Sequence, residues 1–230
     1  MKTIGMIGGM SWHSTIAYYR IINETINAQL GGFASARCLL YSVEFGEIDA
    51  LERQGRWDET AQITIQAAQS VERGGADFVV ICTNTSHRIA DQVAASINIP
   101  LLHIADATAH AIQARGLHKV GLLGTRFTME GDFISGRIAR NFGIEVVTPD
   151  EPGRVEIDRV IYDELCAGQF LDGSRARYVD VIKRLVGAGV EGIILGCTEI
   201  GLLIRPEDSP VPVFDTARIH AEAAADYALA

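Results

Sequence analysis

The sequence predicts an α/β protein made of two similar doubly wound, parallel-sheet units. Apolar strand segments alternate with helical segments along the whole chain, and the order βαβαβαβα occurs twice. The second half also repeats details of the first, since the glycine-bounded strand at 120–124 resembles that at 4–8 and Val-Pro-Val-Phe resembles Ile-Pro-Leu-Leu. Alternating strands and helices favour parallel sheets, and such self-similarity indicates duplication.

The first repeat begins with an apolar strand that runs directly into Gly8-Gly9. Ser11 or Ser14 is a suitable N-cap for the long helix that follows, and Gly31-Gly32 ends it. The region 44–55 reads as a loop with a short helical turn. The strands expected in this repeat are 2–7, 37–43, 78–82 and 99–103, and the later helices are 58–73, 85–97 and 106–115.

The second repeat begins at 119. Its expected strands are 119–124, 144–147, the apolar run 193–196 and 211–214. Its expected helices are 127–141, 155–167 closed by Gly168, the helix from the N-cap Ser174 to 188, and 216–229. Because no linker or low-complexity segment separates the repeats, we expect two tightly packed units.

Composition excludes several classes of protein. The chain has 230 residues, of which 48% are hydrophobic, and a formal net charge of −9. An acidic protein without a basic run is a poor ligand for nucleic acid or an anionic membrane surface. No apolar stretch has the length of a bilayer span, and the N-terminus reads as a strand rather than a signal peptide. We expect a cytoplasmic protein with reduced thiols.

Glycines, histidines and cysteines narrow the chemistry further. Gly5-Met6-Ile7-Gly8-Gly9 lacks the spacing of a dinucleotide fingerprint and the lysine of a P-loop. The six histidines show no metal-ligand spacing, so we expect no metal. Among them, His87 is the one close enough to a candidate site to orient it. Cys38, Cys82 and Cys166 read as small buried apolar residues.

Thr83 and Cys197 are the strongest candidates for chemistry. Aligning Gly75 with Gly189 places Thr83 on Cys197, and each follows an apolar strand and precedes polar residues. Ligands of open α/β sheets bind beyond the carboxyl ends of the strands. A hydroxyl and a thiol at matched strand ends are therefore expected to face one substrate. Cys197 has no basic neighbour in sequence, so main-chain N–H groups are the expected source of stabilisation for its thiolate.

These motifs resemble those of the aspartate/glutamate racemase family, whose members racemise amino acids without pyridoxal phosphate. The resemblance rests on Gly-Met-Ile-Gly-Gly-Met-Ser-Trp at 5–12, Cys-Thr-Asn-Thr at 82–85 and Gly-Cys-Thr-Glu at 196–199, and it extends along the whole chain. It is closest to the branch specific for L-aspartate and L-glutamate or of broad specificity. The family has cysteine in both motifs, whereas here Thr83 occupies the first position. Cys82 lies one residue too early, on the other face of the strand.

The resemblance implies a cofactor-independent racemase whose active site lies between the two units. It implies that residues 1–100 with 211–230 form the first unit, which carries Thr83, and 101–210 the second, which carries Cys197. Cys197 would remove the α-proton of the L-amino acid and Thr83 would protonate the opposite face. The implied substrate-binding residues are Met10, Glu52, Arg53, Asn84, Thr85, Thr198 and Glu199.

Substrate preference and class remain open at this point. Glu52 would repel an acidic side chain whereas Arg53 would attract one. The same fold accommodates hydantoin racemase, maleate isomerase and arylmalonate decarboxylase activities. A non-catalytic amino-acid-binding module and, more weakly, a thiol redox protein are the alternatives from other classes. The partner implied is a small amino acid, and the family's frequent assembly is a homodimer.

Overall fold

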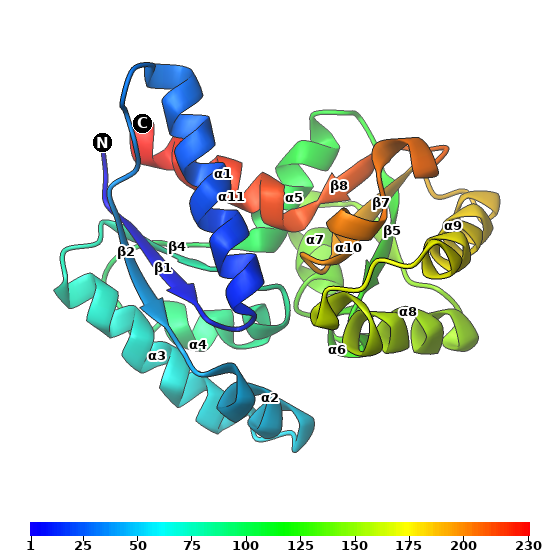
Figure 1. The fold of residues 1–230 in the computed structure, drawn as a ribbon, viewed down its shortest axis with the longest axis horizontal. Coiled ribbons are helices and arrows are strands. Elements are labelled where there is room, and N and C mark those ends of the chain that lie inside the picture. The colour runs from blue at the N-terminus through cyan, green and yellow to red at the C-terminus, as the bar shows by residue number, and fades with distance from the viewer. The chain divides into compact units, whose positions relative to one another are not determined.

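The computed structural model describes residues 1–230, which divide into two compact units. Unit 1 contains residues 1–104 and 220–230, and unit 2 contains residues 105–219. Each unit has its own four-stranded parallel sheet with helices on both faces (Figure 1). The predicted fold class, α/β with two similar parallel-sheet units, is confirmed.

Unit 1 alternates strands and helices from its first residues. Its elements are β1 (Ile4–Gly8), α1 (Trp12–Leu30), β2 (Cys38–Ser42), α2 (Phe45–Arg53), α3 (Trp57–Arg73), β3 (Phe78–Ile81), the 3₁₀ helix η1 (Thr85–Ile89), α4 (Ala90–Ala94), β4 (Leu101–Leu102) and the greater part of α11 (Thr216–Leu229).

Unit 2 follows the same plan with more helical breaks. Its elements are α5 (Ile104–Gln113), β5 (Lys119–Gly124), α6 (Arg126–Glu130), α7 (Ser135–Phe142), β6 (Glu145–Val147), α8 (Glu151–Asp163), η2 (Leu165–Ala167), α9 (Asp172–Gly187), β7 (Gly192–Gly196), α10 (Ile200–Leu203), η3 (Pro206–Asp208) and β8 (Val213–Asp215). None of the helices in either unit combines the length and apolar character of a membrane span.

The two sheets share one topology, which is the structural expression of the sequence repeat. Their orders are β2-β1-β3-β4 and β6-β5-β7-β8, and all pairs are parallel. Ile7 pairs with Ile81 in the first sheet and Leu123 pairs with Leu195 in the second. Two residues beyond the last of each pair stand Thr83 and Cys197, so they follow β3 and β7 at equivalent positions.

The core of unit 1 lies on both faces of its sheet. Ile7, Val79 and Ile81 pack with α3 on one face. The alternate residues of β1 and β3 point to the other face, which α1 and α11 cover (Figure 1), and there Phe78 meets Tyr227 edge to face. Gly5 allows α3 to lie close to the central strand, because a Cβ at this position would approach Val71 to 2.8 Å.

The core of unit 2 is a second, separate apolar cluster. It joins Leu123, Ile193 and Leu195 of the sheet to α8, α9 and α10, and Cys197 packs against its edge. Tyr178 of α9 is fully buried in this cluster and its hydroxyl donates to the Ile157 carbonyl at 2.9 Å. The strand that precedes Cys197 therefore packs against large apolar side chains of these helices.

The boundary of the units differs from the one expected at 211. Residues 211–219 belong to unit 2, because β8 pairs in parallel with β7, and unit 1 resumes only at His220. The chain leaves unit 1 after Ile104, four residues beyond the expected boundary. In the terminal helix, the residues from His220 onward belong to unit 1.

Several helices differ in extent from the sequence expectation. The region 44–55 contains the nine-residue helix α2, whose N-cap Glu44 accepts the N–H groups of Gly46 and Glu47. The expected helices 85–97, 127–141 and 155–167 are each divided, into η1 and α4, α6 and α7, and α8 and η2. Among the cysteines, Cys82 is buried as expected, whereas Cys38 is half-buried and Cys166 is exposed.

Candidate active site

Thr83 lies at the carboxyl edge of the first sheet, half-buried, in a tight loop that leads into η1. His87 closes this loop, because its N–H donates to the Asn84 carbonyl at 3.0 Å and its Nδ1 lies 2.7 Å from the Thr83 carbonyl. The neighbouring Cys82 is 2% exposed, and burial raises its pKa far above the ordinary value. The Cys82 thiol therefore cannot act as a base in place of the family cysteine whose position Thr83 occupies.

The loop after β1 is held in a strained conformation beside the same edge. Gly9 has φ +92°, and a Cβ there would lie 2.2 Å from the Val43 carbonyl oxygen, so only glycine fits. Its N–H donates to Thr15 Oγ1 at 2.9 Å. Ser11, with φ 90°, is the one non-glycine residue with positive φ. Strain of this kind persists where the surroundings hold a functional loop in place.

Met10, Glu52 and Ser86 form a buried polar cluster at this edge. The Ser86 hydroxyl lies 2.9 Å from Met10 Sδ and 3.3 Å from Glu52 Oε1. Burial raises the pKa of Glu52 from 4.5 to about 7, and nearby Asp49 adds to the increase, whereas the Ser86 hydrogen bond and Arg88 oppose it. The Ser86 hydroxyl donates to Glu52 Oε1, so a protonated Glu52 keeps this hydrogen bond and retains its own O–H as a donor.

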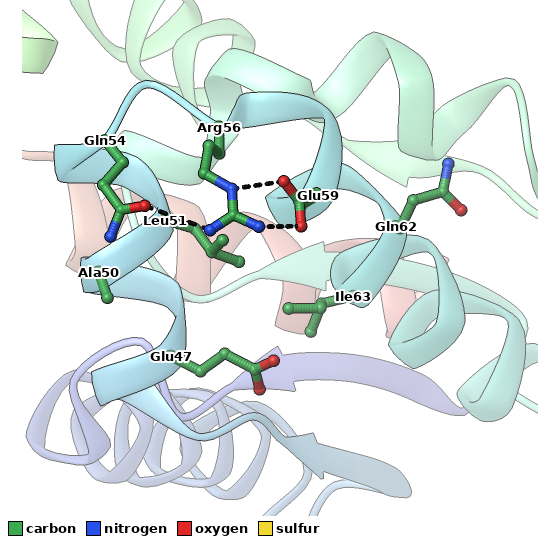
Figure 2. Close-up of a pocket in the computed structure, with 8 residues that line it drawn as sticks. All are labelled: Glu47, Ala50, Leu51, Gln54, Arg56, Glu59, Gln62 and Ile63. Atoms are coloured by element: carbon green, nitrogen blue, oxygen red, sulfur yellow. Dashed lines mark hydrogen bonds and ion pairs between the residues drawn. The ribbon is translucent and has the colours of Figure 1, made fainter.

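Arg53 occupies a different environment from Glu52. It lies on the exposed side of α2, where its guanidinium pairs with Asp49 at 2.8 Å. The structure therefore brings Glu52, but not Arg53, to the cluster with Met10. A hollow of about 460 Å³ also borders α2, but none of the predicted site residues lines it (Figure 2). Arg56, paired with Glu59, lies across it between α2 and α3.

Cys197 is half-buried at the carboxyl edge of the second sheet. Its Sγ donates to Glu199 Oε2 at 3.1 Å. Burial and then the Glu199 carboxylate raise the pKa of Cys197 well above its ordinary value, and the main-chain N–H of Glu199 opposes them only weakly. A main-chain N–H favours the thiolate, as expected from the sequence, but burial and Glu199 outweigh it. In this structure Cys197 is a thiol whose proton points at the carboxylate of Glu199, a residue that is 7% exposed.

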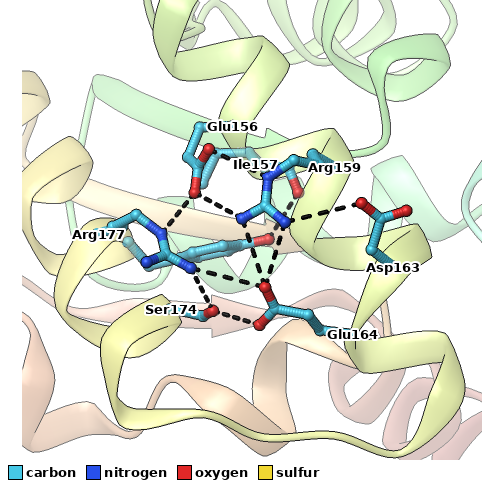
Figure 3. Close-up of polar contacts among 8 residues, drawn as sticks. Glu156, Ile157, Arg159, Asp163, Glu164, Ser174 and Arg177 are labelled. Carbon is cyan, nitrogen blue, oxygen red and sulfur yellow. Dashed lines mark hydrogen bonds and ion pairs between the residues drawn. The ribbon is translucent and has the colours of Figure 1, made fainter.

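A polar network joins α8 and α9, the helices that pack near Cys197. Glu164 is buried, accepts hydrogen bonds from Ser174 and Arg159 and forms an ion pair with Arg177 (Figure 3). Both arginines also pair with Glu156. Burial raises the pKa of Tyr178, and the charge of Cys197 raises it further. Tyr178 belongs to the apolar cluster against which Cys197 packs. The network thereby supports the α8–α9 pair on which the Cys197 strand packs.

The predicted site residues thus fall into two groups, one at each sheet edge. Unit 1 carries Met10, Glu52, Thr83, Asn84 and Thr85, and unit 2 carries Cys197, Thr198 and Glu199. Ser86 was not among the site residues expected from the sequence, although it directly follows the Cys-Thr-Asn-Thr motif at 82–85. No group of three or more His, Cys, Asp or Glu side chains is arranged to hold a metal ion.

Known proteins are similar to this chain over most or all of its length. Over its full length the chain is 55% identical to a candidate Asp/Glu racemase from Yersinia pestis, whose crystal structure superposes with a TM-score of 0.95. An aspartate racemase homologue from Pyrococcus horikoshii OT3 is 35% identical over the full length of both chains, with a TM-score of 0.88. The broad-specificity amino-acid racemase RacX of Bacillus subtilis (strain 168) is 22% identical over 160 residues, 70% of this chain and 68% of RacX.

The two parallel four-stranded sheets and the similarity to these racemases define the class of protein: it is a racemase, which is an isomerase. The chain belongs to the Asp/Glu/Hydantoin racemase family, whose model matches residues 7–224. The resemblance inferred from the sequence motifs is confirmed.

Proposed function

We propose that the chain is a cofactor-independent amino-acid racemase that uses Cys197 and Thr83 on opposite faces of the substrate α-carbon. The observation that carries the proposal is the equivalence of these two residues, each two positions beyond the paired residues Leu195 and Ile81 of matching strands. Membership of the racemase family supports it. A thiol and a hydroxyl at equivalent strand ends provide the two proton-carrying groups that inversion at carbon requires.

The reaction begins when the Cys197 thiolate takes the α-proton of the L-amino acid. The electron pair of the C–H bond passes into the α-carboxylate, which Asn84, Thr85 and Thr198 bind together with main-chain N–H groups. The Thr83 hydroxyl, or a water that it holds, then gives a proton to the opposite face. One proton is removed and one is added, so the cycle closes when Thr83 regains its proton and Cys197 loses one to solvent.

Glu199 is the group through which the thiol proton is proposed to pass to solvent. Its carboxylate already accepts the Cys197 S–H hydrogen bond. The thiolate is unfavourable in the empty site because burial and Glu199 raise the pKa of Cys197. The α-ammonium group of a bound amino acid would bring a positive charge to the site and lower that pKa. Ligand binding would thus generate the base only when a substrate is present.

The proposed substrates are L-aspartate and L-glutamate. An ionised Glu52 would repel their side chains, but its pKa of about 7 leaves much of it neutral at neutral pH. A neutral carboxyl group can donate a hydrogen bond to a substrate carboxylate. We therefore expect the affinity for acidic amino acids to fall as pH rises above 7, in favour of neutral or cationic ones.

Proton NMR in D2O tests the proposal. The wild type is expected to remove the α-proton signal of L-aspartate or L-glutamate, and Cys197→Ala to abolish the loss. Cys38→Ala, at a half-buried thiol remote from the proposed chemistry, is the matched control and should exchange at the wild-type rate. Thr83→Ala should slow racemisation by about 10²-fold, the lower end of what a general acid contributes, while still permitting exchange from the L-substrate.

The unequal basicity of the two groups predicts an asymmetry. A threonine alkoxide is far less accessible than a thiolate, so kcat should be larger from the L-enantiomer. Enantiomers have equal free energies in water, so kcat/KM must be equal in the two directions. Equal kcat from both would contradict the assignment of roles. Stabilisation of the protein by an amino acid without any exchange would indicate a binding module instead.

A further inference from the structure

Three imidazoles lie together inside unit 1, next to the Thr83 loop. The rings of His87 and His103 are 4.6 Å apart between centroids, and those of His87 and His220 are 5.6 Å apart. Their exposed fractions are 2%, 7% and 0% for His87, His103 and His220. Buried polar rings are stable only when their nitrogens are hydrogen-bonded, so the partners of these nitrogens define what the cluster does.

The partners of His87 determine its tautomer. Its Nδ1 lies 2.7 Å from the Thr83 carbonyl oxygen, which only accepts hydrogen bonds, so Nδ1 carries the proton. Its Nε2 lies 3.1 Å from the Ile104 nitrogen, whose N–H only donates, so Nε2 is unprotonated. The ring is therefore a neutral Nδ1–H imidazole. It joins the peptide that follows Thr83 to the first residue of α5.

His220 has the opposite tautomer for the same kind of reason. Its Nε2 lies 3.0 Å from the Leu102 carbonyl and must donate to it. In the neutral ring, Nδ1 then accepts from the Tyr18 hydroxyl at 2.9 Å. The ring thereby ties the last residue of β4 to α1 and α11.

These contacts meet where the chain passes from one unit to the other. It leaves unit 1 after Ile104 and returns at His220. Ile104 is bound to His87, and His220 is bound to Leu102, two residues before the exit. Both crossing points are therefore attached within unit 1 to the same histidine cluster, and His87 connects that cluster to the carbonyl of Thr83.

We infer that His87 is a positioning residue for Thr83, held as the Nδ1–H tautomer between the Thr83 carbonyl and the Ile104 N–H. The consequence for catalysis rests on the proposed racemase function. Donation to its carbonyl fixes the orientation of the Thr83 peptide, and thus of the hydroxyl that protonates the substrate. The Ile104 contact makes that orientation depend on the segment through which the chain leaves unit 1.

Two substitutions separate the two hydrogen bonds. An asparagine at 87 places its amide N–H near the position of Nδ1, so His87→Asn keeps donation to Thr83 and loses acceptance from Ile104. A glutamine reaches the position of Nε2, so His87→Gln keeps the Ile104 contact and loses donation to Thr83. We expect His87→Gln to lower kcat by about five- to tenfold at unchanged KM, the loss of one hydrogen bond. His87→Asn should retain kcat within about twofold and unfold at a lower temperature.

His118→Asn and His118→Gln are the matched controls, because His118 is exposed in unit 2 and should tolerate both. Equal kcat losses in His87→Asn and His87→Gln, or wild-type kcat in His87→Gln, would overturn the positioning role. A KM change without a kcat change would also overturn it.

Nitrogen-15 NMR of the imidazoles tests the geometry without any activity. The wild type should show His87 protonated at Nδ1 with a proton coupled to that nitrogen, and the opposite tautomer would refute the inference. If the wild type shows this tautomer but exchanges no α-proton, the proposed function fails while the His87 geometry stands. If it exchanges protons and the tautomer is Nε2–H, the inference fails while the proposed function stands.

Discussion

At the scale of single residues, Glu52 couples the stability of unit 1 to pH. Its pKa is about 7 in the folded protein against 4.5 ordinarily, so between these values the folded state binds more protons than the unfolded state. The free energy of unfolding should then fall as pH rises through this range, by about 3 kcal/mol for this group. Glu52→Gln should remove this loss, because glutamine keeps a neutral hydrogen-bonding side chain in the cluster.

The measurement is urea unfolding of the wild type and of Glu52→Gln at pH 5 and pH 8. The two proteins should be similarly stable at pH 5, and the variant should be more stable by about 2–3 kcal/mol at pH 8. Glu207→Gln, at an exposed carboxylate in unit 2, is the control and should follow the wild type at both pH values. A wild type that keeps its stability up to pH 8 would contradict the buried, neutral state of Glu52.

Residue identities at the strand ends were predictable, whereas their environments were not. The alignment of Thr83 with Cys197 required only apolar runs and glycines, which are local in sequence. That Cys197 donates to the Glu199 carboxylate, whose effect outweighs that of the main-chain N–H, depends on the turn after β7. The separation of Glu52 from Arg53 depends on which face of α2 is buried, and a segment read as a loop gives no such face.

At the scale of elements, strands were easier to predict than helix ends. Buried parallel strands are continuous apolar runs, so β1, β3, β5 and β7 stand out in the sequence. α2 is longer than the short helical turn expected at 44–55. Its N-cap, Glu44, is not among the usual N-cap residues, although it accepts two N–H groups here. The expected helix at 85–97 begins instead as a 3₁₀ turn, since His87 bonds back to the Thr83 carbonyl. Such long-range or back-bonded contacts are invisible to periodicity.

Ser174 illustrates the same point and leads to a prediction about α8 and α9. The sequence indicated an N-cap, but α9 begins at Asp172, and the buried Ser174 hydroxyl instead donates to Glu164 (Figure 3). Ser174→Ala should lower the free energy of unfolding by about 1–2 kcal/mol, because it removes a hydrogen bond to a buried charge. Thermal and urea unfolding of the variant measure the loss.

Ser70→Ala is the control, because the Ser70 hydroxyl also donates a hydrogen bond, to the Gln66 carbonyl, but on the exposed side of α3. Its effect should stay within about 0.5 kcal/mol. If both variants lost the same small amount, Glu164 would not depend on Ser174 for its place between Arg159 and Arg177.

At the scale of the whole molecule, the repeat was readable from sequence but the boundary was not. Duplication is visible because equivalent strands keep their glycines and apolar runs. The assignment of 211–219 to unit 2 depends on the pairing of β8 with β7, which is a contact between segments and leaves no local mark. The consequence is an asymmetry: unit 2 is continuous in the chain, whereas unit 1 is completed by residues 220–230.

This asymmetry predicts different behaviour for the two units in isolation. Residues 105–219 contain a complete four-stranded sheet and its own apolar core, within the usual size range of domains of about 100–150 residues. We expect this fragment to unfold cooperatively on heating and to give a dispersed ¹⁵N–¹H spectrum. Residues 1–104 alone should do neither, since they lack the side chains that cover one face of the first sheet, namely Ala221, Ala224, Ala225, Tyr227 and Ala228.

Joining residues 220–230 to the end of 1–104 through a short glycine-serine linker should restore cooperative unfolding to the first fragment. The restored contacts include the Lys2 N–H donating to the Ala228 carbonyl at 2.8 Å and the edge-to-face contact of Phe78 with Tyr227. The same linked fragment carrying Ala224→Asp is the control, because a carboxylate at this fully buried position has no compensating partner. If 1–104 folded as stably without the terminal helix as with it, α11 would not be part of the first core.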